Sequence, residues 1–151
     1  MWFSRKQAVK VPPKGAASGA AAVAKQVTTK SRGDAAEAAA LAYLVRAGLR
    51  LVEANYRTPG RGGGEIDLVM RAPDGTLVFV EVRQRSNASH GGAGASIGSL
   101  KQRRIIFAAR HYLMRFASLP PCRFDVVLIN GALSERADAI IEWLPAAFDA
   151  S

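Results

Sequence analysis

The chain has one cysteine, Cys122, in 151 residues, and its apolar residues never form a long run. A single thiol cannot make an internal disulfide, and no Cys and His residues have the spacing of a zinc site. No segment approaches the roughly 18 to 20 consecutive apolar residues that span a bilayer. These absences exclude a disulfide scaffold and a transmembrane segment, and they lead us to expect a cytoplasmic protein without a membrane partner.

Acidic residues are missing from two parts of the chain. Residues 1–33 contain seven basic residues and no acid, so the remainder has fourteen basic and twelve acidic residues, a net charge of +2 against +9 for the whole chain. Residues 82–124 contain eight basic residues and again no acid. Such a local excess favours a polyanionic partner, although a solvated basic helix face explains it equally well.

The first 32 residues differ in composition from the rest. They are rich in Ala, Lys, Gly, Ser and Thr, contain Pro12 and Pro13, and show no sustained helical or strand period. We therefore predict a flexible basic tail over 1–32, which would add nonspecific attraction for phosphates. The length suits one domain and not two, and we place this domain at 33–148.

Local patterns predict the elements of this domain. Asp34 and Glu37 form a capping box ahead of an apolar helical stripe that stops near Gly48. There follow a strand over 49–57, a mobile glycine loop over 58–64, strands over 65–71 and 76–84, a loop over 85–98, a helix over 99–117, and strands over 123–130 and 139–144. The order α-β-β-β-α-β-β predicts an α/β fold with helices against a mixed sheet.

Side chains alternate along the first strand of the central hairpin. We expect Glu65 and Asp67 on one face of this strand, and Ile66 and Leu68 on the other. On the second strand the same rule places Glu81 and Arg83 on one face, and Val80 and Val82 on the other. The hairpin therefore predicts a polar face with carboxylates on both strands.

The turn at Pro73-Asp74-Gly75 sets the register of this hairpin. If its glycine takes the left-handed position of a three-residue loop, Ala72 pairs with Thr76. Counting back, Asp67 then lies opposite Glu81, with Cβ atoms about 5 Å apart. A slip of one residue would destroy this opposition.

Two opposed carboxylates in an apolar hairpin repel, so one pKa should rise unless a cation intervenes. Mg²⁺ prefers a few carboxylates and water in an octahedral array, so a metal at Asp67 and Glu81 would remove the conflict. Arg83 would lie beside it on the same face. Alternatively, Glu81 pairs with Arg83 or Arg85, and Asp67 is merely exposed.

Three further acids each allow two interpretations. Glu37 lies one helical turn before Leu41, so it could reach the sheet, or it could only close the capping box. Glu65 could support a metal site or simply begin its strand in solvent. Asp125 lies in an apolar strand and should pair with Arg123 or with a helix residue.

Several motifs occur in a specific joint order. They are Gly33-Asp34-Ala35-Ala36-Glu37, Asn55-Tyr56-Arg57, Gly-Glu-Ile-Asp-Leu-Val at 64–69, Val-Phe-Val-Glu-Val-Arg-Gln-Arg at 78–85, Lys101, Arg-Phe-Asp-Val-Val at 123–127, and Trp143 with Ala147-Phe148. Together they cover about residues 33–148 and resemble the YraN-like family of small bacterial proteins. The resemblance implies a restriction-endonuclease-like fold, similar to archaeal Holliday-junction resolvases and tRNA-endonuclease-like domains.

The resemblance also implies roles for single residues. Asp67 and Glu81 match the metal-binding acids of the Asp…Glu-x-Lys nuclease motif, and Glu37 matches a helix glutamate that joins them in the resolvase-like branch. Arg83 stands where that motif has lysine. Because arginine stays protonated, it can stabilise charge on a phosphate but cannot take a proton from water.

We therefore expect an endonuclease that uses Mg²⁺ or Mn²⁺ and acts on DNA more readily than RNA, and on branched DNA by analogy with resolvases. The expected metal ligands are Asp67, Glu81, Glu37 and the backbone carbonyl of Val82. The expected nucleic-acid contacts are Arg83, Arg85, Lys101, Arg103, Arg104 and Arg110. The loop 60–64 would fold over the substrate, and a homodimer is expected by analogy only.

Two other functions fit the same sequence. A non-catalytic nucleic-acid-binding module would keep the fold, and Arg83 in the lysine position favours it. An adaptor that binds its partner through the basic tail is the third hypothesis. The three hypotheses predict different results. A nuclease needs metal, whereas a binding module keeps a salt-dependent affinity without metal. An adaptor loses its binding when residues 1–32 are removed.

Overall fold

The computed structural model describes residues 29–84 and 97–131 together with 140–150, and it describes residue 85 by its backbone alone. Side chains of 29–32 are likewise not described. The predicted tail up to residue 28 and most of the predicted loop 85–98 lie outside the described residues.

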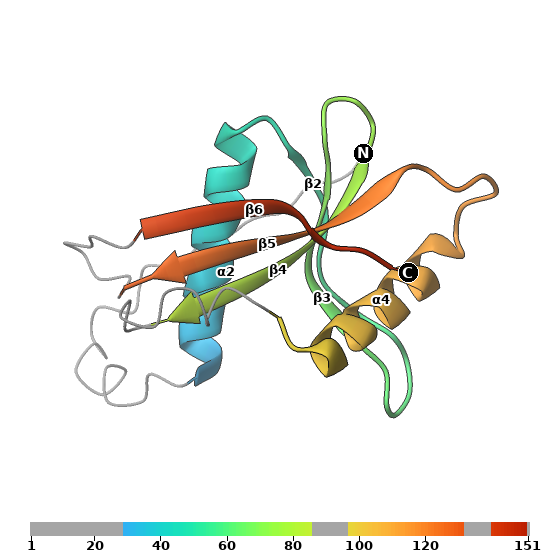
Figure 1. Ribbon diagram of the computed structural model, residues 1–151, viewed down its shortest axis with the longest axis horizontal. Coiled ribbons are helices and arrows are strands. Elements are labelled where there is room, and N and C mark those ends of the chain that lie inside the picture. The colour runs from blue at the N-terminus through green and yellow to red at the C-terminus, as the bar shows by residue number, and fades with distance from the viewer. Residues whose placement is uncertain (1–28, 86–96, 132–139, 151) are drawn as a thin grey trace, which may run out of the picture. The chain divides into compact units, whose positions relative to one another are not determined.

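The described elements follow the predicted order. They are α2 (Thr29–Arg46), β2 (Arg50–Arg57), β3 (Glu65–Arg71), β4 (Leu77–Arg85), α4 (Ser99–Leu113), β5 (Cys122–Asn130) and β6 (Ile140–Phe148). The predicted α/β fold with the order α-β-β-β-α-β-β is therefore confirmed (Figure 1).

Three predicted ends differ from the structure. Helix α2 begins at Thr29, so Asp34 lies inside it and does not cap it. Helix α4 ends at Leu113 because the amide of Met114 turns to the carbonyls of His111 and Tyr112, which tightens the last turn. Strand β6 continues through Pro145, since it lies at the edge of the sheet, where a missing amide is tolerated.

The five strands form one mixed sheet in the order β2-β3-β4-β5-β6. Only the β4–β5 pair is parallel among the described strands, and α4 provides the crossover that a parallel pair needs. The sheet belongs to the compact unit Gly33–Ser151. No helix in the described part of the chain is long and apolar enough to cross a membrane.

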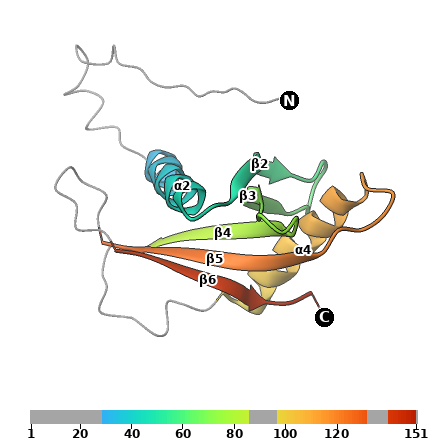
Figure 2. The same ribbon diagram turned by 90° about the horizontal axis from the view of Figure 1, so that it is seen from above.

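The two helices cover opposite faces of the sheet (Figure 2). Alternate residues of β4 divide between the two cores: Val78 and Val80 pack beneath α2, whereas Leu77 and Phe79 pack against α4. Both faces are thus buried at the centre of the sheet. A carboxylate on β4 consequently leaves water at some energetic cost.

One predicted face is wrong. Ile66 does not share a face with Leu68, because Ile66 packs with Tyr56 and α4, whereas Leu68 packs beneath α2. The cause is local twist: the pairing of β3 with β4 begins only at Leu68, while its pairing with β2 extends back to Glu65. A two-stranded ribbon twists more strongly than a sheet interior, and Asn55 with φ 54° bends it further.

Candidate functional site

The β3–β4 hairpin has the predicted register. Leu68 pairs with Val80, and the amide of Ala72 donates to the carbonyl of Thr76 at 2.9 Å. Gly75 has φ 93°, as the left-handed position of this turn requires. The turn chemistry alone therefore fixes which residues of the two strands oppose each other.

Asp67 and Glu81 are the next pair in this register, and they lie where the two strands separate. The ladder between β3 and β4 ends at Leu68 and Val80, after which β4 continues along β5 and β3 along β2. At this point the amide of Val82 donates to Oδ2 of Asp67 at 2.8 Å. A side-chain carboxylate thus replaces the backbone carbonyl that an unbroken ladder would supply. We call this place the acidic fork, formed by Glu37, Asp67 and Glu81.

The three carboxyl groups of the acidic fork are joined by hydrogen bonds. Glu37 of α2 bonds to Asp67 and to Asn55, and Asp67 also bonds to Glu81. Two carboxyl groups can share a hydrogen bond only if one of them carries a proton. Asp67 also accepts from the Val82 amide and lies between the two glutamates.

Burial dominates the electrostatics of the acidic fork. Burial, reinforced by the charge of Asp67, raises the pKa of Glu37 to about 7 and that of Glu81 to about 8. Burial also raises the pKa of Asp67, although the hydrogen bond from the Val82 amide opposes this rise. Glu37 and Glu81 are therefore harder to ionise than glutamates in solvent.

Lys101 is the cation that approaches the acidic fork. Its Nζ lies 3.4 Å from Oε2 of Glu81, and Glu81 is only 7% exposed. The alternative expectation of an exposed Asp67 is wrong, whereas a pairing of Glu81 with Arg83 or Arg85 stays a prediction. Glu81 makes its ion pair with α4, and Asp67 is half-buried. The sequence had indicated Lys101 only as a phosphate contact.

Asp125 is a different kind of buried acid. It accepts from Arg123 Nε at 2.9 Å, as expected, and also from Trp143 Nε1 and the amide of Ala146, each at 2.9 Å. It is fully buried and saturated with donors. We assign it to the joining of β5 and β6 rather than to the site.

The glycine loop predicted to be mobile is fastened at its base. The amide of Thr58 donates to the carbonyl of Gly64 at 3.1 Å, and the amide of Gly64 donates to Oγ1 of Thr58 at 2.9 Å. A Cβ at Gly64 would collide with the carbonyl oxygen of Arg104. The loop is therefore held against the backbone of α4, and its folding over a substrate stays a prediction.

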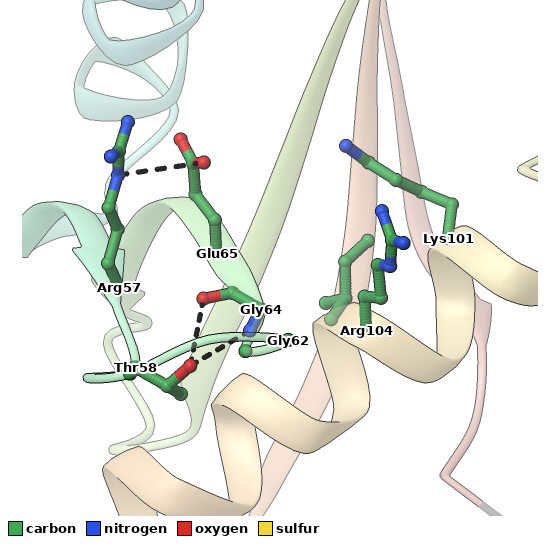
Figure 3. A pocket seen from close by; sticks show the side chains of 10 residues that line it. Arg57, Thr58, Gly62, Gly64, Glu65, Lys101 and Arg104 are labelled. Atoms are coloured by element: carbon green, nitrogen blue, oxygen red, sulfur yellow. Dashed lines mark hydrogen bonds and ion pairs between the residues drawn. The ribbon is translucent and has the colours of Figure 1, made fainter.

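A cavity of about 340 Å³ opens between this loop and α4 (Figure 3). Arg57 and Glu65 lie on one side of it, and Lys101 and Arg104 project from α4 on the other. Two of the predicted nucleic-acid contacts thus meet here. Arg57 was not predicted from the sequence as a residue of this cavity, although it belongs to the Asn-Tyr-Arg motif.

The remaining predicted contacts are spread more widely. Arg103 is exposed on α4, and Arg110, near the helix end, donates to the carbonyl of Ala150 at 3.4 Å. Arg83 lies half-buried on β4, and the side chain of Arg85 lies outside the described residues. The structure therefore gathers Lys101 and Arg104 but not the whole predicted set.

The donor set of the acidic fork suits a hard divalent cation. Carboxylate oxygens are the ligands that Mg²⁺ and Mn²⁺ prefer, and a buried acid cluster gains most from an added positive charge. In this hydrogen-bonded arrangement, no three His, Cys, Asp or Glu side chains of the described residues are arranged to hold a metal ion. The predicted ligands fit the metal by chemistry, and the carbonyl of Val82 as a ligand stays a prediction.

Comparison with known sequences identifies the family. Residues 36–129 match the family described as "Uncharacterised protein family UPF0102". The chain is 83% identical to a UPF0102 protein of Polaromonas naphthalenivorans and 72% identical to one of a Polaromonas species, each over the full length of both chains. It is 68% identical to a UPF0102 protein of Albidiferax ferrireducens over 82% of this chain and 91% of that protein. The resemblance to YraN-like proteins is thereby confirmed, and the chain belongs to the UPF0102 family.

Proposed function

We propose that this protein is a metal-dependent endonuclease that hydrolyses phosphodiesters of DNA, with structured or branched DNA as the preferred substrate. One observation carries the proposal: Glu37, Asp67 and Glu81 come from three separate elements and their carboxyl groups meet at one place, where Glu81 is buried and the other two are half-buried. Acids with perturbed pKa values beside a basic cavity are typical of a functional site.

Metal binding would draw on Asp67 and Glu81, with Glu37 and the carbonyl of Val82 completing the oxygen ligands. When bound, Mg²⁺ or Mn²⁺ would lower the pKa of a coordinated water and offset charge on the scissile phosphate. Glu37 and Glu81 would have to lose their protons first, and with pKa values of about 7 and about 8 the cation can displace these protons near neutral pH.

The residues of the chain would divide the remaining work. Glu37 would orient the attacking water and accept its proton while the oxygen of that water bonds to phosphorus. The ester bond to the leaving oxygen then breaks, and that oxygen takes a proton from solvent. Lys101 and Arg83 would stabilise the charge on the phosphate oxygens.

The position of Lys101 strengthens the catalytic hypothesis. Arg83 stands at the lysine position of the nuclease motif, which on its own favours a module that binds nucleic acid without cleaving it. The structure nevertheless brings an amino group to Glu81 from α4. A non-catalytic module remains the second candidate function, and a two-fold branched substrate would call for a homodimer.

A cleavage assay tests the proposal. Labelled single-stranded, duplex, flapped and four-way DNA, and RNA, would be incubated with Mg²⁺ or Mn²⁺ and with the wild type, Asp67→Asn or Glu81→Gln. The matched control is Asp74→Asn, because Asp74 is an exposed acid of the same hairpin whose turn asparagine also supports. Metal-dependent cutting that the first two changes abolish and the control keeps is expected. Intact binding without cutting by the wild type would leave the non-catalytic module.

A further inference from the structure

The cavity between the glycine loop and α4 is not explained by the acidic fork. Its lining contains Arg57, Lys101 and Arg104, one acid, Glu65, and little apolar surface apart from Ile105. We infer that this cavity is a second phosphate subsite, which holds a backbone phosphodiester next to the one placed at the acidic fork. That the ligand is a nucleic-acid strand rests on the proposed function. That the cavity binds phosphate rests on the charges of its own lining.

The charges of the cavity select an anion. Three cations face one carboxylate, and that carboxylate is already engaged, because Arg57 Nε lies 3.7 Å from Oε1 of Glu65. Both partners of this pair are well exposed, with side-chain exposures of 73% and 43%. Such a pair is weak, so a phosphate can compete for Arg57. A neutral or apolar ligand would find few partners here.

The walls of the cavity are built before any ligand arrives. The hydrogen bonds between Thr58 and Gly64 close the loop, and Gly63 and Gly64 let it approach where a side chain could not fit. A Cβ at Gly63 would collide with Oγ1 of Thr58, and one at Gly64 with the carbonyl of Arg104. Glycine is therefore required at both positions by the close packing of the loop. Because the loop is already closed, ligand binding need not order it.

Lys101 connects the cavity to the acidic fork. The same side chain lines the cavity and makes the ion pair with Glu81 at 3.4 Å. Arg57 and Arg104 lie on opposite sides of the cavity (Figure 3), so a strand with one phosphate at the fork would place the neighbouring phosphate between them. The strand would run along the first turns of α4 and not along its far end, where Arg110 contacts the last described residues.

The experiment measures binding of a labelled DNA strand by fluorescence anisotropy at several salt concentrations, with a chelator present so that nothing is cut. The variants are Arg57→Gln, Arg104→Gln and Glu65→Gln. The control is Arg46→Gln, because Arg46 is an exposed arginine at the end of α2. Arg57→Gln and Arg104→Gln should each weaken binding severalfold and lower the salt slope by about 0.7. Glu65→Gln should tighten binding, a change of sign that a misfolded variant cannot imitate.

The possible outcomes distinguish failure of the phosphate subsite from failure of the proposed nuclease activity. If the wild type cuts DNA while Arg57→Gln and Arg104→Gln bind like Arg46→Gln, the subsite is wrong and the nuclease stands. If the wild type does not cut but the salt slopes change as expected, the subsite stands and the nuclease falls. No binding by the wild type would overturn both. Variants that alter the affinity for a free mononucleotide but not for the strand would also overturn the strand subsite.

Discussion

The amino group of Lys101 lies 3.4 Å from Oε2 of Glu81, so an ion pair joins the first turn of α4 to the middle of β4. This contact brings a lysine to the acidic fork although position 83 of the motif is arginine. It also lowers the pKa of Glu81, against the burial that raises it. Lys101 is therefore placed to govern both the charge of the fork and the phosphate beside it.

Replacing Lys101 by methionine should lower the cleavage rate by about 100-fold, because a preformed positive group at a developing charge contributes on this scale. Lys101→Arg keeps the charge and should retain most strand binding. The control is Arg46→Met, on an exposed arginine of α2. Initial rates at saturating metal provide the measurement. Wild-type rates for Lys101→Met would mean that Arg83 alone meets the phosphate.

The metal-free protein should lose stability as the pH rises. Glu37 and Glu81 have folded-state pKa values of about 7 and about 8, both above the ordinary value of 4.5. The folded state therefore binds more protons than the unfolded chain between these limits, so this contribution is complete below about pH 4.5 and is lost as the pH passes about 8. For the buried Glu81 the loss should be on the order of a few kcal/mol in the free energy of unfolding, and the half-buried Glu37 should add less because solvent screens its charge.

Denaturant unfolding in the presence of a chelator, at about pH 5 and about pH 8, measures this dependence. Glu81→Gln removes the group with the higher pKa, so its unfolding free energy should change less between the two pH values. An equal pH dependence in the wild type and in Glu81→Gln would show that the fork does not hold the proton.

Gly64→Ala should destabilise the fold, because the added Cβ meets the carbonyl oxygen of Arg104, a backbone atom that cannot move aside. We expect a loss of about 1–3 kcal/mol, typical of overpacking. Gly33→Ala is the matched control, because Gly33 lies in α2 and has open space around its Cβ position. This change should raise the free energy of unfolding by at most about 1 kcal/mol. Changes of the same sign in both variants would contradict the close approach of the loop to α4.

Asp125→Asn should destabilise the protein far more than Asp67→Asn. Asp125 is fully buried and accepts from Arg123, Trp143 and the Ala146 amide, so an amide in its place leaves buried groups poorly paired at a cost of about 2–4 kcal/mol. At Asp67 the substitution relieves crowded carboxyls and should cost little. Thermal unfolding of the two variants tests this contrast, and a reversed order would mean that the fork is structural.

Much of the hairpin could be predicted because its information is local. The turn Pro73-Asp74-Gly75 sets the loop length and the left-handed glycine, and these fix the register that opposes Asp67 and Glu81. The pairing of Asp125 with Arg123, one of the two partners expected for it, is equally local, since both lie on one face of β5.

The rest depended on how separate elements meet. The approach of Lys101 to Glu81 depends on where α4 packs after a long connection, and no pattern within α4 contains that placement. The face of Ile66 was mispredicted because regular alternation fails where β3 leaves β4 and twists with β2. The two glycines that close the cavity were taken for a sign of mobility, because their contact with α4 and Thr58 is tertiary.

We propose that the acidic fork binds a divalent cation and gives up protons when it does so. The most direct test is calorimetric titration with Mn²⁺ at about pH 7, in two buffers of different ionisation enthalpy, for the wild type, Asp67→Asn and the control Asp74→Asn. We predict binding with net proton release in the wild type and in Asp74→Asn, and its loss in Asp67→Asn. Mn²⁺ binding without proton release, or binding that Asp67→Asn leaves unchanged, would contradict the account.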